Sequence, residues 1–223
     1  MSESLINTIY MSVAFLALFG SAELLYHVFK IQAEITRKYV HIVTGLLTML
    51  FPLLIGNHWL VLLLCSSFLI ILVASLYFKM LPSINAVQRV TRGSILYPIV
   101  VYGCYLLFYY YGELRFFYLP ILILAICDPI AALVGKKWPM GSYYLFGHSK
   151  TMSGSFGFFS SATIMCIAIM VGVEELNFSD AILISLIVAL FTCAAEAVTH
   201  KGYDNLTIPA SALLALTITQ EMF

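Results

Sequence analysis

Long apolar runs separated by short polar connections dominate the chain. A helix needs about 17–25 residues to cross a bilayer, and eight runs approach or reach that length: 5–28, 40–55, 59–78, 95–111, 116–134, 156–173, 181–198 and 206–219. The second and the last run are the shortest, so a count of seven spans is the alternative. The pattern predicts an all-α, polytopic integral membrane protein, in which residues 1–223 form a single domain of about eight transmembrane helices.

The composition supports a protein that lies in lipid. Hydrophobic residues make up 62% of the 223 residues and charged residues only 10%, with a mean hydropathy of +0.99. A soluble domain has about 25% charged residues. The net charge is zero, so no overall field points to nucleic acid as a partner.

The basic residues are distributed unevenly between alternate connections. The connections after the first, third, fifth and seventh runs carry ten of the eleven Lys and Arg residues, and the opposite side has only Arg115. Because cytoplasmic loops are enriched in Lys and Arg, this face is predicted to be cytoplasmic, with both termini outside. The membrane would be a cell inner membrane or an endomembrane. The ten residues are Lys30, Arg37, Lys38, Lys79, Arg89, Arg92, Lys136, Lys137, Lys150 and Lys201.

Several polar residues lie near the predicted cytoplasmic ends of the spans. Glu23, Asp128 and Glu196 are acids inside apolar runs, and Arg37 and His41, four residues apart, share one helix face. An acid within a span is costly unless it is paired, so it marks a functional site by default. Each residue alone could be an interfacial anchor or a helix cap, but all three acids lie toward the same side.

The connection 135–155 has the composition of a phosphate-binding loop. It contains Lys136 and ends in Lys150-Thr151 and Gly154-Ser155, immediately before the next apolar run. A Gly- and Ser-rich loop with a lysine at a helix start offers backbone N–H groups and positive charge to an anion. The alternative is a stop-transfer loop whose lysines lie at the lipid surface.

These residue types together suit a nucleotide bound with Mg²⁺, which takes one or two carboxylates plus phosphate oxygens. The chain contains neither the P-loop motif GxxxxGK[ST] nor the protein-kinase motifs. The residues alone therefore predict a cytoplasm-facing membrane enzyme that acts on a phosphate compound and a lipid.

Five motifs between about residues 34 and 210 occur in the same order as in the polyprenol kinase family, which includes phytol kinase, dolichol kinase and CTP-dependent diacylglycerol kinases. The chain departs from the family in one motif, where Cys127 replaces the glycine before Asp128 and Pro129 follows it. The segments that carry the resemblance are 37–45 (RKYVHIVTG), 92–98 (RGSILYP), 128–135 (DPIAALVG), 150–155 (KTMSGS), and Glu196 with 204–209 (DNLTIP).

The resemblance implies a lipid kinase. It would transfer the γ-phosphate of CTP, with Mg²⁺, to the hydroxyl of diacylglycerol or of an isoprenoid alcohol such as phytol, farnesol or a polyprenol, taken from the bilayer. Asp128, Asp204 and Asn205 are the metal-binding candidates. The candidates for binding the nucleotide and its phosphates are Arg37, Lys38, Arg92, Ser94, Lys136, Lys150, Thr151, Gly154 and Ser155.

The catalytic candidates are Asp128, His41 and Glu196. Of the two residues left for a general base, we expect Glu196 to take the proton because it lies deeper in its span. His41 shares a helix face with Arg37, and we expect it to contact phosphate.

Two other functions stay open. A phosphatidate cytidylyltransferase, which makes CDP-diacylglycerol, has a distantly similar closing motif. A transporter or scaffold is the alternative from another class. Transporters have polar mid-span positions, discontinuous helices or inverted repeats, whereas the mid-span positions here are mostly Leu, Ile, Phe and Val, with no visible repeat.

Overall fold

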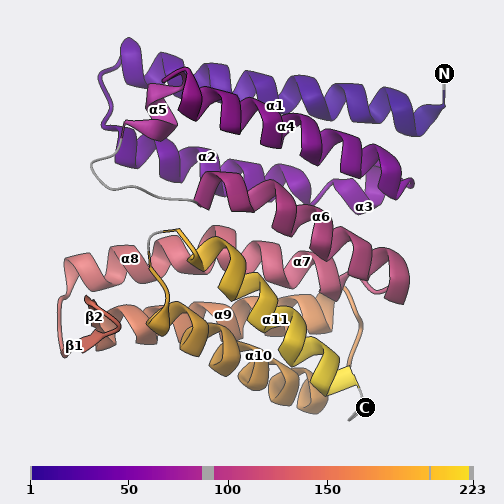
Figure 1. The fold of residues 1–223 in the computed structure, drawn as a ribbon. Coiled ribbons are helices and arrows are strands. Elements are labelled where there is room, and N and C mark those ends of the chain that lie inside the picture. Colours follow the sequence, from indigo (N-terminus) through magenta and orange to yellow (C-terminus); the bar gives the residue numbers. More distant parts are fainter. Residues whose placement is uncertain (1, 87–92, 201, 221–223) are drawn as a thin grey trace.

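A computed structural model describes residues 2–86, 93–200 and 202–220 as a bundle of helices with one small β-hairpin (Figure 1). The first part of the chain forms α1 (Glu3–His27), α2 (Ala33–Thr48), α3 (Phe51–Leu54), α4 (His58–Tyr77), α5 (Pro82–Asn85) and α6 (Gly93–Tyr111). The second part forms α7 (Arg115–Leu122), η1 (Ile123–Cys127), α8 (Asp128–Lys137), β1 (Ser142–Leu145), β2 (His148–Thr151), α9 (Met152–Gly172), α10 (Phe178–Val198) and α11 (Asp204–Gln220).

The long helices run along one common direction, and the bundle has two distinct ends (Figure 1). Both termini lie at one end, which we call the far end. The hairpin β1–β2, the start of α2 and the connection between α10 and α11 lie at the other, which we call the site end. The predicted cytoplasmic connections that the structure describes therefore gather at a single end of the molecule.

All eight predicted apolar runs form helices, and the prediction of an all-α polytopic membrane protein is confirmed. Six helical segments of the described residues are long and apolar enough to cross a membrane: α1, α4, α6, the continuous helix Arg115–Lys137, α9 and α10. The other two, α2 and α11, have 16 and 17 residues. These are the two runs that the sequence marks as shortest.

The helix α2 differs from the predicted run in both of its bounds. It begins at Ala33, before the apolar run, because Glu34, Arg37 and Lys38 form a polar helix face at the site end. It stops at Thr48, whose carbonyl would bond the N–H of residue 52 in a continuing helix. Residue 52 is proline and has no N–H, so the chain turns and resumes as α3.

The connection 135–155 contains structure that the sequence analysis did not predict. β1 and β2 pair antiparallel from Ser142 opposite Thr151 to Leu145 opposite His148. The hairpin turn has positive φ at Phe146 and Gly147, as two-residue hairpin loops require. Thr151 then caps α9 by accepting a hydrogen bond from the N–H of Gly154 at 3.1 Å. The hairpin thus presents its second strand to the start of a membrane helix.

Candidate active site

A cavity of about 960 Å³ lies at the site end and extends into the bundle. Its outer part is lined by polar and charged residues, which we call the polar cluster: Arg37, Lys38, His41, Asp128, Lys136, Lys150, Glu196, Asp204 and Asn205. Its inner part is lined by apolar residues, which we call the apolar chamber: Phe15, Phe19, Phe51, Leu64, Cys65, Phe68, Leu72 and Val101. One internal space therefore borders both a charged surface and an apolar one.

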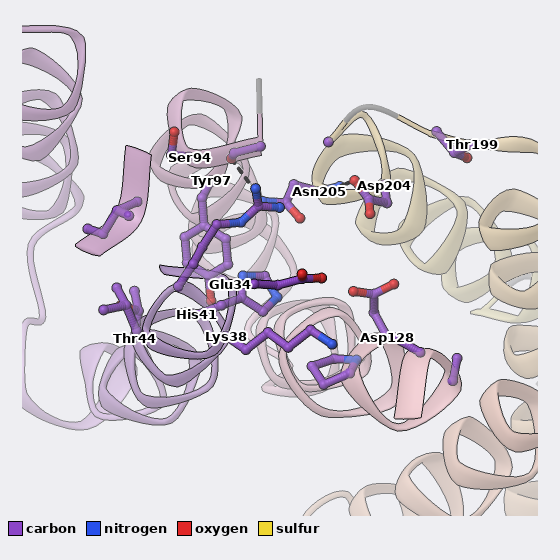
Figure 2. Close-up of a pocket in the computed structure, with 18 of the residues that line it drawn as sticks. Glu34, Lys38, His41, Thr44, Ser94, Tyr97, Asp128, Thr199, Asp204 and Asn205 are labelled. Carbon is purple, nitrogen blue, oxygen red and sulfur yellow. Dashed lines mark hydrogen bonds between the residues drawn. The ribbon is translucent and has the colours of Figure 1, made fainter. Parts of the chain in front are cut away.

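The polar cluster is assembled from helices that are distant in sequence. Figure 2 shows Lys38 and Glu34 reaching from α2 toward the space that Asp128 of α8 faces. Asp204 and Asn205 enter the same view from the start of α11. Lys150 comes from β2 and Glu196 from the last turn of α10.

Asp128 is positioned by an irregularity in its helix. Its N–H bonds the carbonyl of Ile123, five residues back, and not that of Leu124 as in an α-helix. Pro129 has no N–H with which to continue this wider pattern. The carbonyl of Leu124 consequently loses its donor within the helix, and the Nε2–H of His41 donates to it at 3.1 Å. A π-helical turn of this kind is frequent at functional sites.

The hydrogen bond from His41 fixes the orientation of its ring. Because a carbonyl can only accept, Nε2 carries the proton. The ring also packs edge-on against Tyr97 of α6, with centroids 5.3 Å apart. His41 therefore joins α2 to both η1 and α6 at the inner boundary of the polar cluster.

Lys150 and Glu196 form an ion pair across the cavity wall. The Nζ of Lys150 donates to Oε1 of Glu196 and also to the backbone carbonyl of the same residue. Glu196 is 8% exposed, and its second carboxylate oxygen, Oε2, is buried without a hydrogen-bond partner among the described residues. A buried acceptor left unsatisfied costs about 1–3 kcal/mol, so this oxygen is poised to accept a proton or a donor from a ligand.

Four charged neighbours in the polar cluster act on the carboxylate of Asp128. Lys38 and Lys150 attract its carboxylate, whereas Asp204 and Glu196 repel it. Two carboxylates that face a common space without a cation between them raise each other's energy. A positively charged ligand or a bound metal ion would relieve that repulsion.

Asn205 anchors the start of α11 to the start of α6. Its Nδ2 donates to the carbonyl of Gly93 at 2.8 Å. A Cβ on Gly93 would lie 2.8 Å from that nitrogen, so a side chain there would displace the amide. The contact fixes Asp204, one residue earlier, at the cavity.

Comparison with known proteins gives one informative match. No protein-family profile and no solved structure matches the chain. Phytol kinase from Synechocystis sp. (strain ATCC 27184 / PCC 6803 / Kazusa) is 30% identical to it over 201 residues, which is 87% of this chain and 84% of that protein.

The chain belongs to the phytol kinase family.

The residues that the family motifs predicted for the site lie together around the cavity. The lining includes Arg37, Lys38, His41, Ser94, Asp128, Lys136, Lys150, Thr151, Gly154, Ser155, Glu196, Asp204 and Asn205. Arg92 lies outside the described residues. The individual roles predicted for these side chains remain predictions, whereas their convergence on one space is a property of the structure.

Two glycines of the phytol kinase motifs serve close packing between helices. A Cβ on Gly135 would lie 2.6 Å from Oγ1 of Thr151 and 3.4 Å from Cα of Gly154. A Cβ on Gly154 would lie 3.1 Å from the carbonyl of Ala131. These glycines therefore let α8 and α9 touch, which holds the hairpin and Lys150 against Asp128's helix. The predicted phosphate contact of Gly154 is additional to this packing role.

Glu23 does not take part in the site, although the sequence analysis grouped it with Asp128 and Glu196. Its Oε1 accepts hydrogen bonds from the backbone N–H and the hydroxyl of Ser83, at 3.1 and 2.5 Å, and its Oε2 pairs with His27 at 3.1 Å. The residue thus ties α5 to α1. Its carboxylate is satisfied by neighbouring protein groups, unlike that of Glu196.

The structure adds Glu34 and His148 to the lining. Glu34 lies three, four and seven residues before Arg37, Lys38 and His41. This spacing places all four residues on one helix face, so the helical periodicity of the family motif, continued toward the N-terminus, could have predicted Glu34. The ring of His148 lies against that of His200, with centroids 3.9 Å apart and the ring planes tilted by 34°. Nothing in the sequence marks that pair, because it joins the hairpin to the segment after α10.

The donor set fits a magnesium ion that is shared with a phosphate. Asp128, Asp204 and Asn205 offer oxygen ligands to the cavity, and Mg²⁺ is usually held by one or two carboxylates plus substrate oxygens and water. Within the described ranges, no group of three or more His, Cys, Asp or Glu side chains is arranged to hold a metal ion alone.

Proposed function

We propose that this protein is a membrane lipid kinase that transfers the γ-phosphate of a nucleotide to the hydroxyl of an isoprenoid alcohol. The observation that carries the proposal is the single cavity that joins the polar cluster to the apolar chamber. A kinase of this type must bring a highly charged donor and an oily acceptor to one point. The relationship to a phytol kinase supports an isoprenoid as acceptor.

The basic residues of the polar cluster would bind the phosphates of the nucleotide. Lys38, Lys136 and Lys150 come from three different elements and line the same space. Lysines around a transferring phosphoryl group neutralise its charge. We take CTP as the donor and Arg37 and Arg92 as further phosphate ligands from the family motifs.

Asp128, Asp204 and Asn205 would hold Mg²⁺ together with the phosphates. When bound, the ion would neutralise charge on the phosphate oxygens. Asp128 is held at the cavity by the π-helical turn, and Asp204 by the Asn205–Gly93 contact. The positions of both residues at the cavity are thus set by contacts within the protein.

Glu196 would act as the general base. The alcohol oxygen attacks the γ-phosphorus, the bond from that phosphorus to the bridging oxygen breaks, and the nucleoside diphosphate leaves with that oxygen. The hydroxyl proton passes to Oε2 of Glu196, the buried oxygen that has no partner among the described residues. Lys150 holds the other oxygen and orients the carboxylate. His41 would orient α2 at the phosphates.

An acceptor panel tests this proposal against its competitors. Purified protein in detergent is supplied with CTP labelled at the γ- or the α-phosphorus, Mg²⁺, and phytol, farnesol, diacylglycerol or phosphatidate. Label from the γ-position in phospho-phytol or phospho-farnesol supports the proposal. Label from the α-position in a CDP-lipid would identify a cytidylyltransferase instead, and ATP and GTP in place of CTP determine the donor.

The proposed orientation places the site end in the cytoplasm. Ser142 begins the exposed hairpin, so a Ser142→Cys variant in a background without other cysteines should resist a membrane-impermeant maleimide in intact cells. It should react after the cells are opened. Reaction in intact cells would place the polar cluster outside and contradict a cytosolic nucleotide as donor.

A further inference from the structure

We infer that the apolar chamber binds the hydrocarbon tail of the acceptor and that its closed inner end limits the length of that tail. The inference rests on the proposed function for the identity of the acceptor. It commits to a short isoprenoid alcohol, of the size of farnesol or phytol, bound with its hydroxyl at the polar cluster and its tail toward α3.

The chamber continues directly from the polar cluster along α2. From His41 the lining passes to Thr44, then to Thr48, and ends at Phe51 in α3. The seven residues from His41 to Thr48 correspond to a depth of about 10 Å at the helical rise of 1.5 Å per residue, and Phe51 lies beyond the turn that follows. The tail of a short isoprenoid alcohol has this scale, whereas a long polyprenol would have to leave the chamber.

The inner end is closed by tightly packed residues. Phe51 and Leu64 are each 1% exposed. Phe51 packs edge-on against Phe15, with centroids 6.0 Å apart, and stacks on Phe117 behind it at 6.3 Å. Phe117 does not line the cavity. The space therefore ends at the ring of Phe51, and the aromatic contacts behind it resist displacement.

The walls are apolar and aromatic. Phe68 of α4 packs edge-on against Phe15 and Phe19 of α1, with centroids 5.2 and 5.7 Å apart. Such a lining gains free energy when it covers an aliphatic chain, because apolar surface is removed from water. It offers nothing to a nucleotide phosphate, so the two substrates are separated by the chemistry of the walls.

A buried hydroxyl without a partner lies between the polar cluster and the apolar chamber. The Oγ1 of Thr44, one helical turn from His41, is buried and makes no hydrogen bond within the part of the chain described. Buried polar groups normally have a partner. The hydroxyl of an alcohol at this position can provide one, which would fix the reacting end of the acceptor beside the polar cluster.

A pair of adjacent residues on α4 allows a matched test. Leu64 lines the chamber and is 1% exposed, whereas Leu63 faces away and is 62% exposed. Leu64→Trp fills the inner end, and Leu63→Trp makes the same change on the outer surface. Turnover is measured for both variants and for Phe51→Leu with geraniol, farnesol, geranylgeraniol, phytol and a prenol longer than phytol.

We expect Leu64→Trp to lower kcat/KM at least tenfold for phytol and geranylgeraniol and less than threefold for geraniol. Leu63→Trp should leave the whole series within twofold of wild type. Phe51→Leu, which shortens the closing side chain, should raise kcat/KM for acceptors longer than phytol. An equal loss for all alcohols in Leu64→Trp, together with no gain for long acceptors in Phe51→Leu, would overturn the length limit.

A photoreactive probe separates this inference from the proposed function. Farnesol carrying a diazirine at its tail end is irradiated with the full protein, without nucleotide, and labelled residues are mapped by mass spectrometry. Labels on Phe15, Leu64 or Phe68 support tail binding in the chamber even if no phosphate transfer is detected. Phosphorylation of prenols with labels confined to lipid-facing residues would overturn the chamber assignment and leave the proposed function intact.

Discussion

The two ends of the bundle use charged residues in opposite ways. At the far end, the guanidinium of Arg115 pairs with Glu113, and its backbone N–H donates to Glu174 at 2.7 Å. Gln220 also reaches Glu113, at 3.5 Å. At the site end, Asp128 and Asp204 face each other's charge across the cavity, and Oε2 of Glu196 has no partner among the described residues.

The difference separates charges that neighbouring protein groups compensate fully from charges that they compensate only in part. A buried or partly buried charge costs free energy unless another group compensates it. At the far end the protein itself supplies that group, and the contact joins the start of α7 to the segment after α9. At the site end compensation is incomplete, which is the condition expected of a binding site. Substitutions at the two ends should therefore have opposite consequences for activity and stability.

The largest effect on activity is expected for Asp128→Asn. The substitution replaces a charged carboxylate ligand of the proposed metal ion by a neutral amide, so kcat should fall by about three orders of magnitude or more. The melting temperature should stay equal to that of wild type or rise, because repulsion from Asp204 and Glu196 is relieved. Steady-state kinetics with thermal unfolding in detergent measure both. Asp180→Asn, at the start of α10, is the control and should keep full turnover.

The second largest loss of activity is expected for Glu196→Gln. The amide cannot take the proton from the acceptor, so kcat should fall by about two to four orders of magnitude, with little change in the KM for nucleotide. Phosphate transfer is measured at saturating nucleotide, and nucleotide binding by calorimetry. Glu175→Gln, an exposed acid at the far end, serves as the control. A Glu196→Gln enzyme with wild-type kcat would remove Glu196 from the proton transfer.

Lys150→Ala should mainly affect the nucleotide. Loss of a charged hydrogen-bond donor is worth about 1.5–3 kcal/mol, so the KM for CTP should rise about 10- to 100-fold. Lys137→Ala is the matched control, because Lys137 lies over the ring of Trp138 at 4.6 Å and does not line the cavity. Equal KM values for the two variants would reduce Lys150 to a structural partner of Glu196.

The smallest effect on activity is expected at the far end. Arg115→Ala removes the guanidinium that pairs with Glu113, and should lower the free energy of unfolding by about 1 kcal/mol. Because neither Arg115 nor Glu113 lines the cavity, kcat and both KM values should stay within twofold of wild type. A loss of activity larger than the loss of folded protein would show that the two ends are coupled.

The sequence predicts the helices and the composition of the polar cluster better than it predicts their contacts. Apolar run length locates each long helix, and motif spacing brings Asp128, Lys150, Glu196 and Asp204 to one side. The sequence does not reveal that Lys150 pairs with Glu196, since the two residues lie 46 positions apart. It also does not reveal that Glu23 has a structural partner, because Ser83 is an ordinary serine in the short helix α5.

The apolar chamber is invisible in the sequence for a different reason. The residues that line the chamber, such as Phe15, Phe51 and Leu64, are of the same types as residues that face lipid. Only packing decides which side of a helix borders an internal space. Leu63 and Leu64 illustrate this, as neighbours of identical type with opposite exposure. In a soluble protein the polar face would have marked the outside. A membrane helix offers no such contrast.

The π-helical turn before Asp128 amounts to the insertion of one residue into a membrane helix. Each residue advances an α-helix by about 100° of rotation, so the side chains after Cys127 are turned by about that angle relative to an uninterrupted helix. The continuous helix Arg115–Lys137 can therefore be buried on nearly every side along α7 and still direct the carboxylate of Asp128 into the cavity. Deletion of a single apolar residue between Ile123 and Cys127 would preserve the hydrophobicity of the span, yet it would rotate Asp128 out of the site.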